Sequence, residues 1–91
     1  MKSDPKKLLK KHDELIQSDV MKVKSHVQRN TEKWVFNTLM IDGCDVPFKY
    51  KRTKQYKNLE GQRVNLTYYA ETESIAGMEF EVMRVIRVKI S

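Results

Sequence analysis

The chain has few of the residues that mark several classes of small protein. Its 91 residues include one cysteine, three glycines and two prolines. A single cysteine, Cys44, cannot form an internal disulfide, which excludes a disulfide-stapled scaffold and agrees with a reducing compartment. Scarce glycine and proline argue against a low-complexity chain, and the 40% of hydrophobic residues is enough to build a core.

Long apolar runs are also missing. No run approaches the roughly 20 residues that a membrane-spanning helix requires, and the first seven residues lead into no apolar segment of the secretory type. The sequence therefore predicts a soluble cytoplasmic protein without a membrane partner. A chain of 91 residues fits a single domain, 1–91, with one core. Residues 1–4 are expected to be frayed.

Residues 5–28 have the pattern of an amphipathic helix. Ser3 or Asp4 can cap its free amides, and Pro5 suits the first turn because its missing N–H would have no partner there. Apolar residues then recur with a period near 3.6. They are Leu8, Leu9, Leu15, Ile16, Val20, Val23 and Val27. The spacing predicts one long N-terminal helix.

After residue 30 the period changes toward two, which indicates strands. Residues 34–41 are apolar on both faces, as an inner strand would be. Asp42-Gly43 predicts a hairpin that pairs them with residues 46–52, because Gly43 supplies the positive φ of a tight turn. Residues 63–71 and 78–90 form the third and fourth predicted strands. The last is long, so a bend or bulge is expected near residues 83–85.

The predicted fold is therefore α+β. An N-terminal helix is followed, over residues 33–90, by a four-stranded antiparallel sheet that curves strongly into a half-barrel-like meander. The turn spacing and the entry into a strand at residues 59–64 resemble small barrels of the SH3 or OB kind. This resemblance is architectural and covers the C-terminal two thirds of the chain.

Positive charge is concentrated in the middle of the chain. The net charge is +6, and between residues 49 and 63 six cations accompany a single acid, Glu60. Such a segment with an interleaved ring can hold phosphates and stack on bases. The predicted nucleic-acid or anion site consists of Lys49, Lys51, Arg52, Lys54, Tyr56, Lys57 and Arg63. Tyr50 is instead expected to pack in the core.

The same charges have a simpler interpretation. Lysines on an exposed edge strand prevent sheets from pairing with each other, and they need no ligand for that purpose. No base-reading motif accompanies the basic segment.

No catalytic constellation is present. The sequence has no paired acids of the catalytic kind, no nucleophile next to a base and no glycine-rich phosphate loop. His12 and His26 would lie about 21 Å apart on one helix, too far to share a metal ion. Cys44 is flanked by Asp42 and Asp45 rather than by the positive groups of a reactive thiolate. We therefore predict no enzyme, no cofactor, no metal and no small-molecule substrate.

The sequence leaves two functional hypotheses. The first is a small basic domain that binds nucleic acid or another polyanion, such as an acidic protein, without strong sequence preference. The alternative is a structural or assembly protein, either a homodimer or an accessory subunit. That alternative rests on residues 34–41, because a strand that is apolar on both faces can pack against another subunit.

Overall fold

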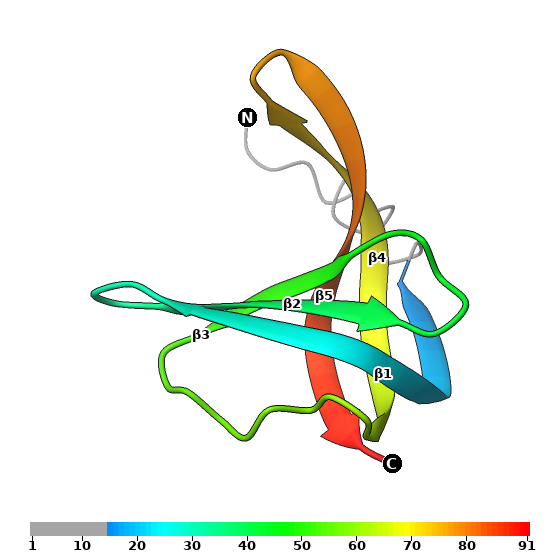
Figure 1. The fold of residues 1–91 in the computed structure, drawn as a ribbon. Helices are drawn as coiled ribbons and strands as arrows, with labels where there is room; N and C mark the ends of the chain where they lie inside the picture. Colours follow the sequence, from blue (N-terminus) through cyan, green and yellow to red (C-terminus); the bar gives the residue numbers. More distant parts are fainter. Residues whose placement is uncertain (1–14) are drawn as a thin grey trace, which may run out of the picture.

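In the computed structural model, residues 15–91 are described and they contain five strands around one core (Figure 1). The strands are β1 (Ile16–Asn30), β2 (Val35–Ile41), β3 (Phe48–Arg52), β4 (Arg63–Ile75) and β5 (Met78–Ile90). They form a closed barrel in the order β1-β2-β3-β5-β4. Neighbours are antiparallel except β3 and β5, which run parallel. This arrangement is that of a five-stranded Greek-key barrel of the OB kind.

The predicted α+β class is wrong, because the described part of the chain contains strands and no helix. Residues 16–28, which the periodicity assigned to the C-terminal half of the helix, belong to β1. Leu15 precedes β1 and belongs to no helix. Residues 5–14 of the predicted helix and the frayed residues 1–4 lie outside the described residues. The sheet also has five strands rather than four, and the β3–β5 contact makes it mixed rather than purely antiparallel.

The helical pattern was misleading because β1 contains two irregularities. Its pairing register shifts between Ser18 and Met21 on the β4 side, and between Val23 and Ser25 on the β2 side. Each bulge adds one residue, so inward positions fall two or three residues apart instead of strictly two. The buried side chains Val23 and His26 are three residues apart. Such mixed spacing imitates a helical period.

Within the described chain, no helix is long and apolar enough to cross a bilayer.

The predicted hairpin is confirmed, since β2 and β3 pair antiparallel across Asp42-Gly43. Gly43 has the expected positive φ, 84°. The alternation expected in residues 34–41 is present, since the odd-numbered residues of β2, 35 to 41, are buried, whereas Phe36 on the other face is 39% exposed. An inner strand covered on both faces was predicted, and within residues 15–91 only one face is covered. The expected bulge in the last strand occurs one residue beyond the predicted range, at Ile86, which the β4–β5 pairing leaves out between Val85 and Arg87.

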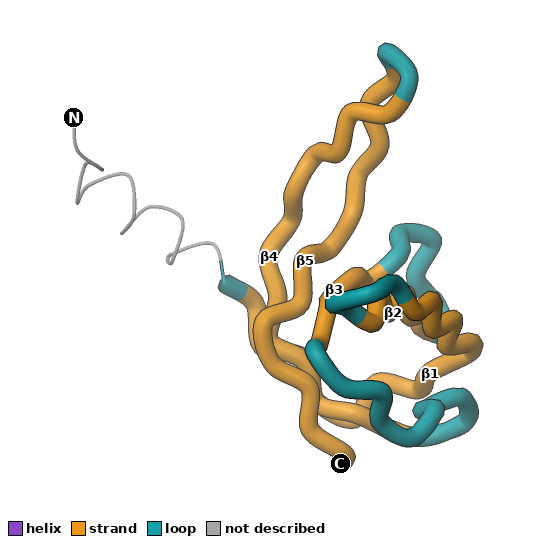
Figure 2. The backbone as a smooth tube through the Cα atoms, turned by 90° about the vertical axis from the view of Figure 1, so that its left-hand side faces the viewer, coloured by secondary structure: helices purple, strands orange, loops and turns teal. Residues whose placement is uncertain are grey.

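The fold has two parts, a barrel and a ribbon that extends from it. The core lies inside the barrel, where Phe48 meets Tyr68 edge-on with ring centroids 4.8 Å apart. Beyond the barrel, β4 and β5 continue as a two-stranded ribbon that stands away from the other strands (Figure 2). We call this ribbon, residues 71–82, the arm. Ala76 and Gly77 form its turn with φ values of 51° and 80°.

A buried histidine connects three segments inside the barrel. His26 on β1 is only 6% exposed. The backbone N–H of Leu59, in the loop before β4, donates to its Nδ1 over 2.8 Å. Nε2 therefore carries the proton and donates to Oδ1 of Asn37 on β2, 2.8 Å away. In addition, the Asn58 side-chain amide donates to the His26 carbonyl. One neutral imidazole thus fixes the 53–62 loop to the barrel.

Replacing this imidazole is expected to destabilise the fold. His26→Leu keeps an apolar side chain but leaves two buried partners, the Leu59 N–H and the Asn37 Oδ1, without a hydrogen bond. Each such group costs about 1–3 kcal/mol. We expect the free energy of unfolding, measured with urea, to fall by about 2–4 kcal/mol. Lys24→Ala, at an exposed neighbouring position, should stay within about 0.5 kcal/mol. A His26→Leu protein as stable as the Lys24→Ala control would contradict this role.

Candidate nucleic-acid interface

The convex outside of β1, β2 and β3 combines aromatic rings with cations. Residues paired across neighbouring strands share a face. Phe36 is paired with Arg29 on one side and with Lys51 on the other. Thr38 is likewise flanked by Val27 and Lys49. We call this surface the outer face. It consists of Val27, Arg29, Trp34, Phe36, Thr38, Lys49 and Lys51.

The two rings of the outer face are open to solvent. Trp34 is 37% exposed and Phe36 is 39% exposed. The Lys51 ammonium lies 4.5 Å from the centroid of the Trp34 ring, a cation–π contact that holds positive charge beside the indole. Arg29 and Lys51 form no ion pair within residues 15–91. Rings and uncompensated cations therefore alternate across three strands.

A groove of about 660 Å³ runs between the outer face and the base of the arm. Phe36, Lys49 and Lys51 line it from the barrel, while Glu73, Arg84 and Ile86 line it from β4 and β5. The groove is therefore made by the closure of the barrel, since no single strand supplies both walls.

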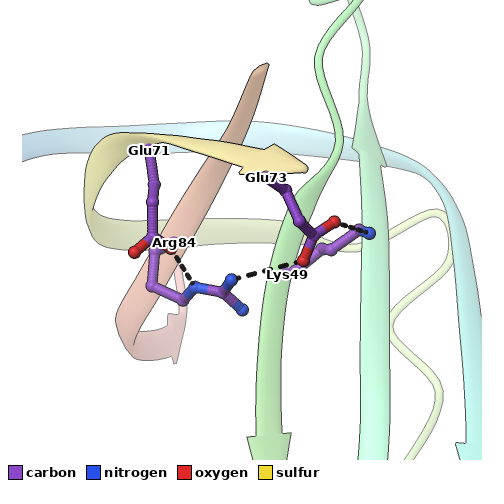
Figure 3. Close-up of polar contacts among 4 residues, drawn as sticks. All are labelled: Lys49, Glu71, Glu73 and Arg84. Carbon is purple, nitrogen blue, oxygen red and sulfur yellow. Dashed lines mark hydrogen bonds and ion pairs between the residues drawn. The ribbon is translucent and has the colours of Figure 1, made fainter. Parts of the chain in front are cut away.

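Four charged side chains are paired at the arm end of this groove (Figure 3). Lys49 Nζ lies 3.0 Å from Glu73 Oε1, and Arg84 Nε lies 2.8 Å from Glu71 Oε1. Arg84 Nη2 also approaches the second oxygen of Glu73 at 3.6 Å. The hydrogen bond and charge of Lys49 lower the pKa of Glu73, and the hydrogen bond to Glu71 raises the pKa of Arg84. The groove is thus nearly neutral at this end.

The structure divides the seven predicted site residues among separate places. Lys49 and Lys51 lie on the outer face, although Lys49 is paired with Glu73. The side chains of Arg52, Tyr56 and Lys57 instead line a different pocket, at the end of the barrel. Lys54 is exposed in the loop after β3. Arg63, which is also exposed, begins β4 opposite Lys22 of β1. The basic segment is not one surface.

Sequence reasoning missed the residues that complete the outer face. Arg29 follows directly after residue 28, where the predicted helix ends. Trp34 and Phe36 fall within residues 34–41, which were predicted to form an inner strand. The predicted hairpin could have identified Phe36 as a residue of this face. Its register places Phe36 on the same side as the solvent-facing Lys51.

Comparison with known proteins gives no relative: no family model matches the sequence, and no curated protein or solved structure matches it significantly. Among residues 15–91, no group of three histidine, cysteine or acidic side chains could hold a metal ion.

The paired carboxylate predicts a pH dependence. The pKa of Glu73 is lowered from its ordinary value of 4.5, so its pairing stabilises the fold above that pH. The contribution is lost as the pH falls through the lower, folded-state pKa. We expect NMR titration of the Glu73 carboxyl carbon to give a midpoint below 4.5. Lys49→Met should move the midpoint upward, whereas Lys89→Met, on the far half of β5, should leave it in place. Equal midpoints in all three proteins would rule out the pairing.

Proposed function

We propose that the chain binds single-stranded nucleic acid through the outer face, without strong sequence preference. The observation that carries this proposal is the row formed by Arg29, Phe36 and Lys51, one residue from each of three adjacent strands, with Trp34 beside it. Unpaired bases stack on exposed rings, and each stacked base contributes about 1–3 kcal/mol. Neighbouring cations hold the phosphates between them.

A single strand suits this surface better than a duplex. In a duplex the base faces are stacked on each other, so Trp34 and Phe36 would meet only backbone or groove edges. Stacking is also tolerant of sequence, because every base has a π-face. A general polyanion, such as an acidic protein, would use the cations but leave the rings without a function.

The charge of the outer face limits how many phosphates it can neutralise. Arg29 and Lys51 are available, whereas Lys49 and Arg84 are shared with glutamates of the arm. Two to four neutralised phosphates correspond to a log–log salt slope between about −1.4 and −3 for a single strand.

A second candidate function, assembly of two copies, is supported by the arm. In antiparallel pairs opposite residues share a face, and here Ile75 lies opposite Met78, and Phe80 opposite Glu73. Ile75, Met78 and Phe80 are 50%, 62% and 44% exposed. A two-stranded ribbon is marginally stable alone, so covering this face would stabilise it.

The charge of the arm favours a second copy as the occupant. Its twelve residues contain four glutamates and neither lysine nor arginine, although the whole chain carries +6. The outer face of another copy offers the complement, since Val27 and Phe36 are exposed there beside Arg29 and Lys51. Glu79 and Glu81 lie on the face opposite Phe80, and Glu71 and Glu73 are already paired with Lys49 and Arg84. Charge would therefore guide the approach of two copies, and the contact itself would be apolar.

Binding of nucleic acid can be tested by fluorescence anisotropy with a labelled oligothymidylate and a matched duplex. We expect a dissociation constant within the usual non-specific range of about 1–100 µM at moderate salt, with the single strand bound more tightly. Phe36→Ala and Trp34→Ala should each weaken binding by about 5-fold or more because a stacked base is lost. Lys51→Gln should also reduce the salt slope by about 0.7.

Lys22→Gln provides the matched control, because Lys22 is an exposed cation of β1 that lies outside the outer face. It should change affinity by much less than Lys51→Gln. Equal losses for the two lysines, or no binding at about 100 µM protein in low salt, would overturn the proposal.

Assembly can be tested by sedimentation velocity over a range of protein concentrations. We expect a dimer that weakens with Phe80→Ser, because this substitution removes part of the proposed contact. Added salt should weaken it as well, because salt screens the attraction between the two copies. Ser74→Ala, on the opposite face of the arm, should leave the dimer intact. A monomer at every concentration would exclude this function and would leave nucleic-acid binding untouched.

A further inference from the structure

A second pocket, of about 320 Å³, opens at the end of the barrel where β3 ends. We call it the mouth pocket. Its walls include Gln28, Tyr50, Arg52, Tyr56, Lys57 and Ile90. Tyr50 and Arg52 alternate along β3 with Lys49 and Lys51, so they point to the inside of the barrel while the lysines point to the outer face. The two surfaces therefore lie on opposite sides of β3, although Asn37 and Tyr50 line both the mouth pocket and the groove beside the outer face.

The cations of the mouth pocket have no acidic partner. Within residues 15–91, the side chain of Arg52 forms neither a hydrogen bond nor an ion pair, and the same is true of the Lys57 side chain. The Arg52 guanidinium instead lies 5.4 Å from the Tyr50 ring centroid and 5.8 Å from that of Tyr56. No acidic side chain from the described residues lines the pocket. The five N–H donors of the guanidinium are thus available to an anion.

The remaining walls suit a planar, largely apolar group. Val88 and Ile90 of β5 and the ring of Tyr56 line the pocket together with Leu59. His26 and Asn37 also reach it, but their polar atoms already have partners, so they do not require a ligand. Burial raises the pKa of Tyr50, which keeps its hydroxyl protonated and able to donate.

The loop that carries Tyr56 is held in place on the barrel. The Gln28 side-chain amide donates to the Tyr56 carbonyl over 2.9 Å, and the Asn30 amide donates to the Gln55 side chain over 3.0 Å. Asn58 adds its bond to the His26 carbonyl. Tyr56 is 61% exposed, yet its own carbonyl and the side chains of Gln55 and Asn58 are bonded to β1. A preformed site loses less free energy on ordering when a ligand binds.

We propose that the mouth pocket binds a single nucleotide, whose phosphate contacts Arg52 and Lys57 and whose base packs between Tyr56 and the apolar wall of β5. The volume is at the lower limit of small-molecule pockets, which admits one nucleotide and not a longer chain. The site does not depend on the outer face. Its ligand is either a free mononucleotide or the terminal, phosphate-bearing nucleotide of a strand.

The experiment is a ¹⁵N–¹H NMR titration of the chain with AMP, adenosine and inorganic phosphate. We expect AMP to shift the amide signals of Arg52, Tyr56, Lys57 and Val88 while that of Phe36 stays in place. Adenosine lacks the phosphate and inorganic phosphate lacks the base, so each should bind at least ten-fold more weakly than AMP. A 5′-phosphorylated trinucleotide then identifies the source: tighter binding than AMP indicates a strand end, and weaker binding a free nucleotide.

Substitutions test whether AMP binding depends on the mouth pocket and not on neighbouring surfaces. Arg52→Gln and Tyr56→Ala should each weaken AMP binding at least ten-fold, and Arg52→Lys should restore part of it. Lys54→Gln, an exposed cation of the same loop, is the matched control and should change affinity less than two-fold. Phe36→Ala should leave AMP binding unchanged, so failure of the outer-face proposal remains distinguishable. The proposal is overturned if AMP at roughly 10 mM shifts no mouth-pocket signal, or if Arg52→Gln binds AMP as well as the original chain does.

Discussion

Closure of the barrel depends on one strand, β1, that pairs with two neighbours in turn. Its first half, from Ile16, pairs with β4, and its second half, to Asn30, pairs with β2. The pairing changes from β4 to β2 between Lys22 and Val23. Just before this change, within the bulge between Ser18 and Met21, Val20 is a β-branched residue with a φ of 55°. Such a conformation costs about 1–3 kcal/mol. Burial of the core that closure encloses offsets this cost, and the Asn65 side chain also accepts a hydrogen bond from the Val20 N–H.

Closure of the barrel also determines which residues share a surface. A strand of a barrel alternates between inside and outside, so consecutive residues of β3 are separated by the sheet itself. Lys51 meets Trp34 on the outside, whereas Arg52 meets Tyr50 and Tyr56 at the mouth. A basic segment that is continuous in the sequence therefore serves two surfaces. Conversely, the outer face combines residues from three strands, and none of these strands alone presents both aromatic rings and cations on this face.

The sequence predicted those features whose causes are local. Asp42-Gly43 and the period-two pattern around Leu39 identified the β2–β3 hairpin and the faces of β2, and the length of β5 indicated its bulge near Ile86. The helix was wrong because bulges in β1 are fixed by its two partners, which sequence spacing does not reveal. The same limit applied to the candidate site, because residue spacing does not reveal contacts between strands that are distant in the sequence. Glu73 pairs with Lys49 across 24 residues, and only closure brings the two side chains together.

The ion pairs at the arm make the positive charge of the outer face uneven along its length. Glu71 and Glu73 neutralise Lys49 and Arg84 where the arm begins, while positive charge remains uncompensated at Lys51, farther along β3. Under the proposed function, phosphates would therefore be attracted most strongly toward the end of the β2–β3 ladder at which Trp34 lies. That ladder ends with the pair of Val35 and Arg52, so the mouth pocket opens at the same end. A strand lying over Phe36 and Trp34 would thus bring its terminal phosphate near Arg52, and the two proposed sites would hold one ligand in a single orientation.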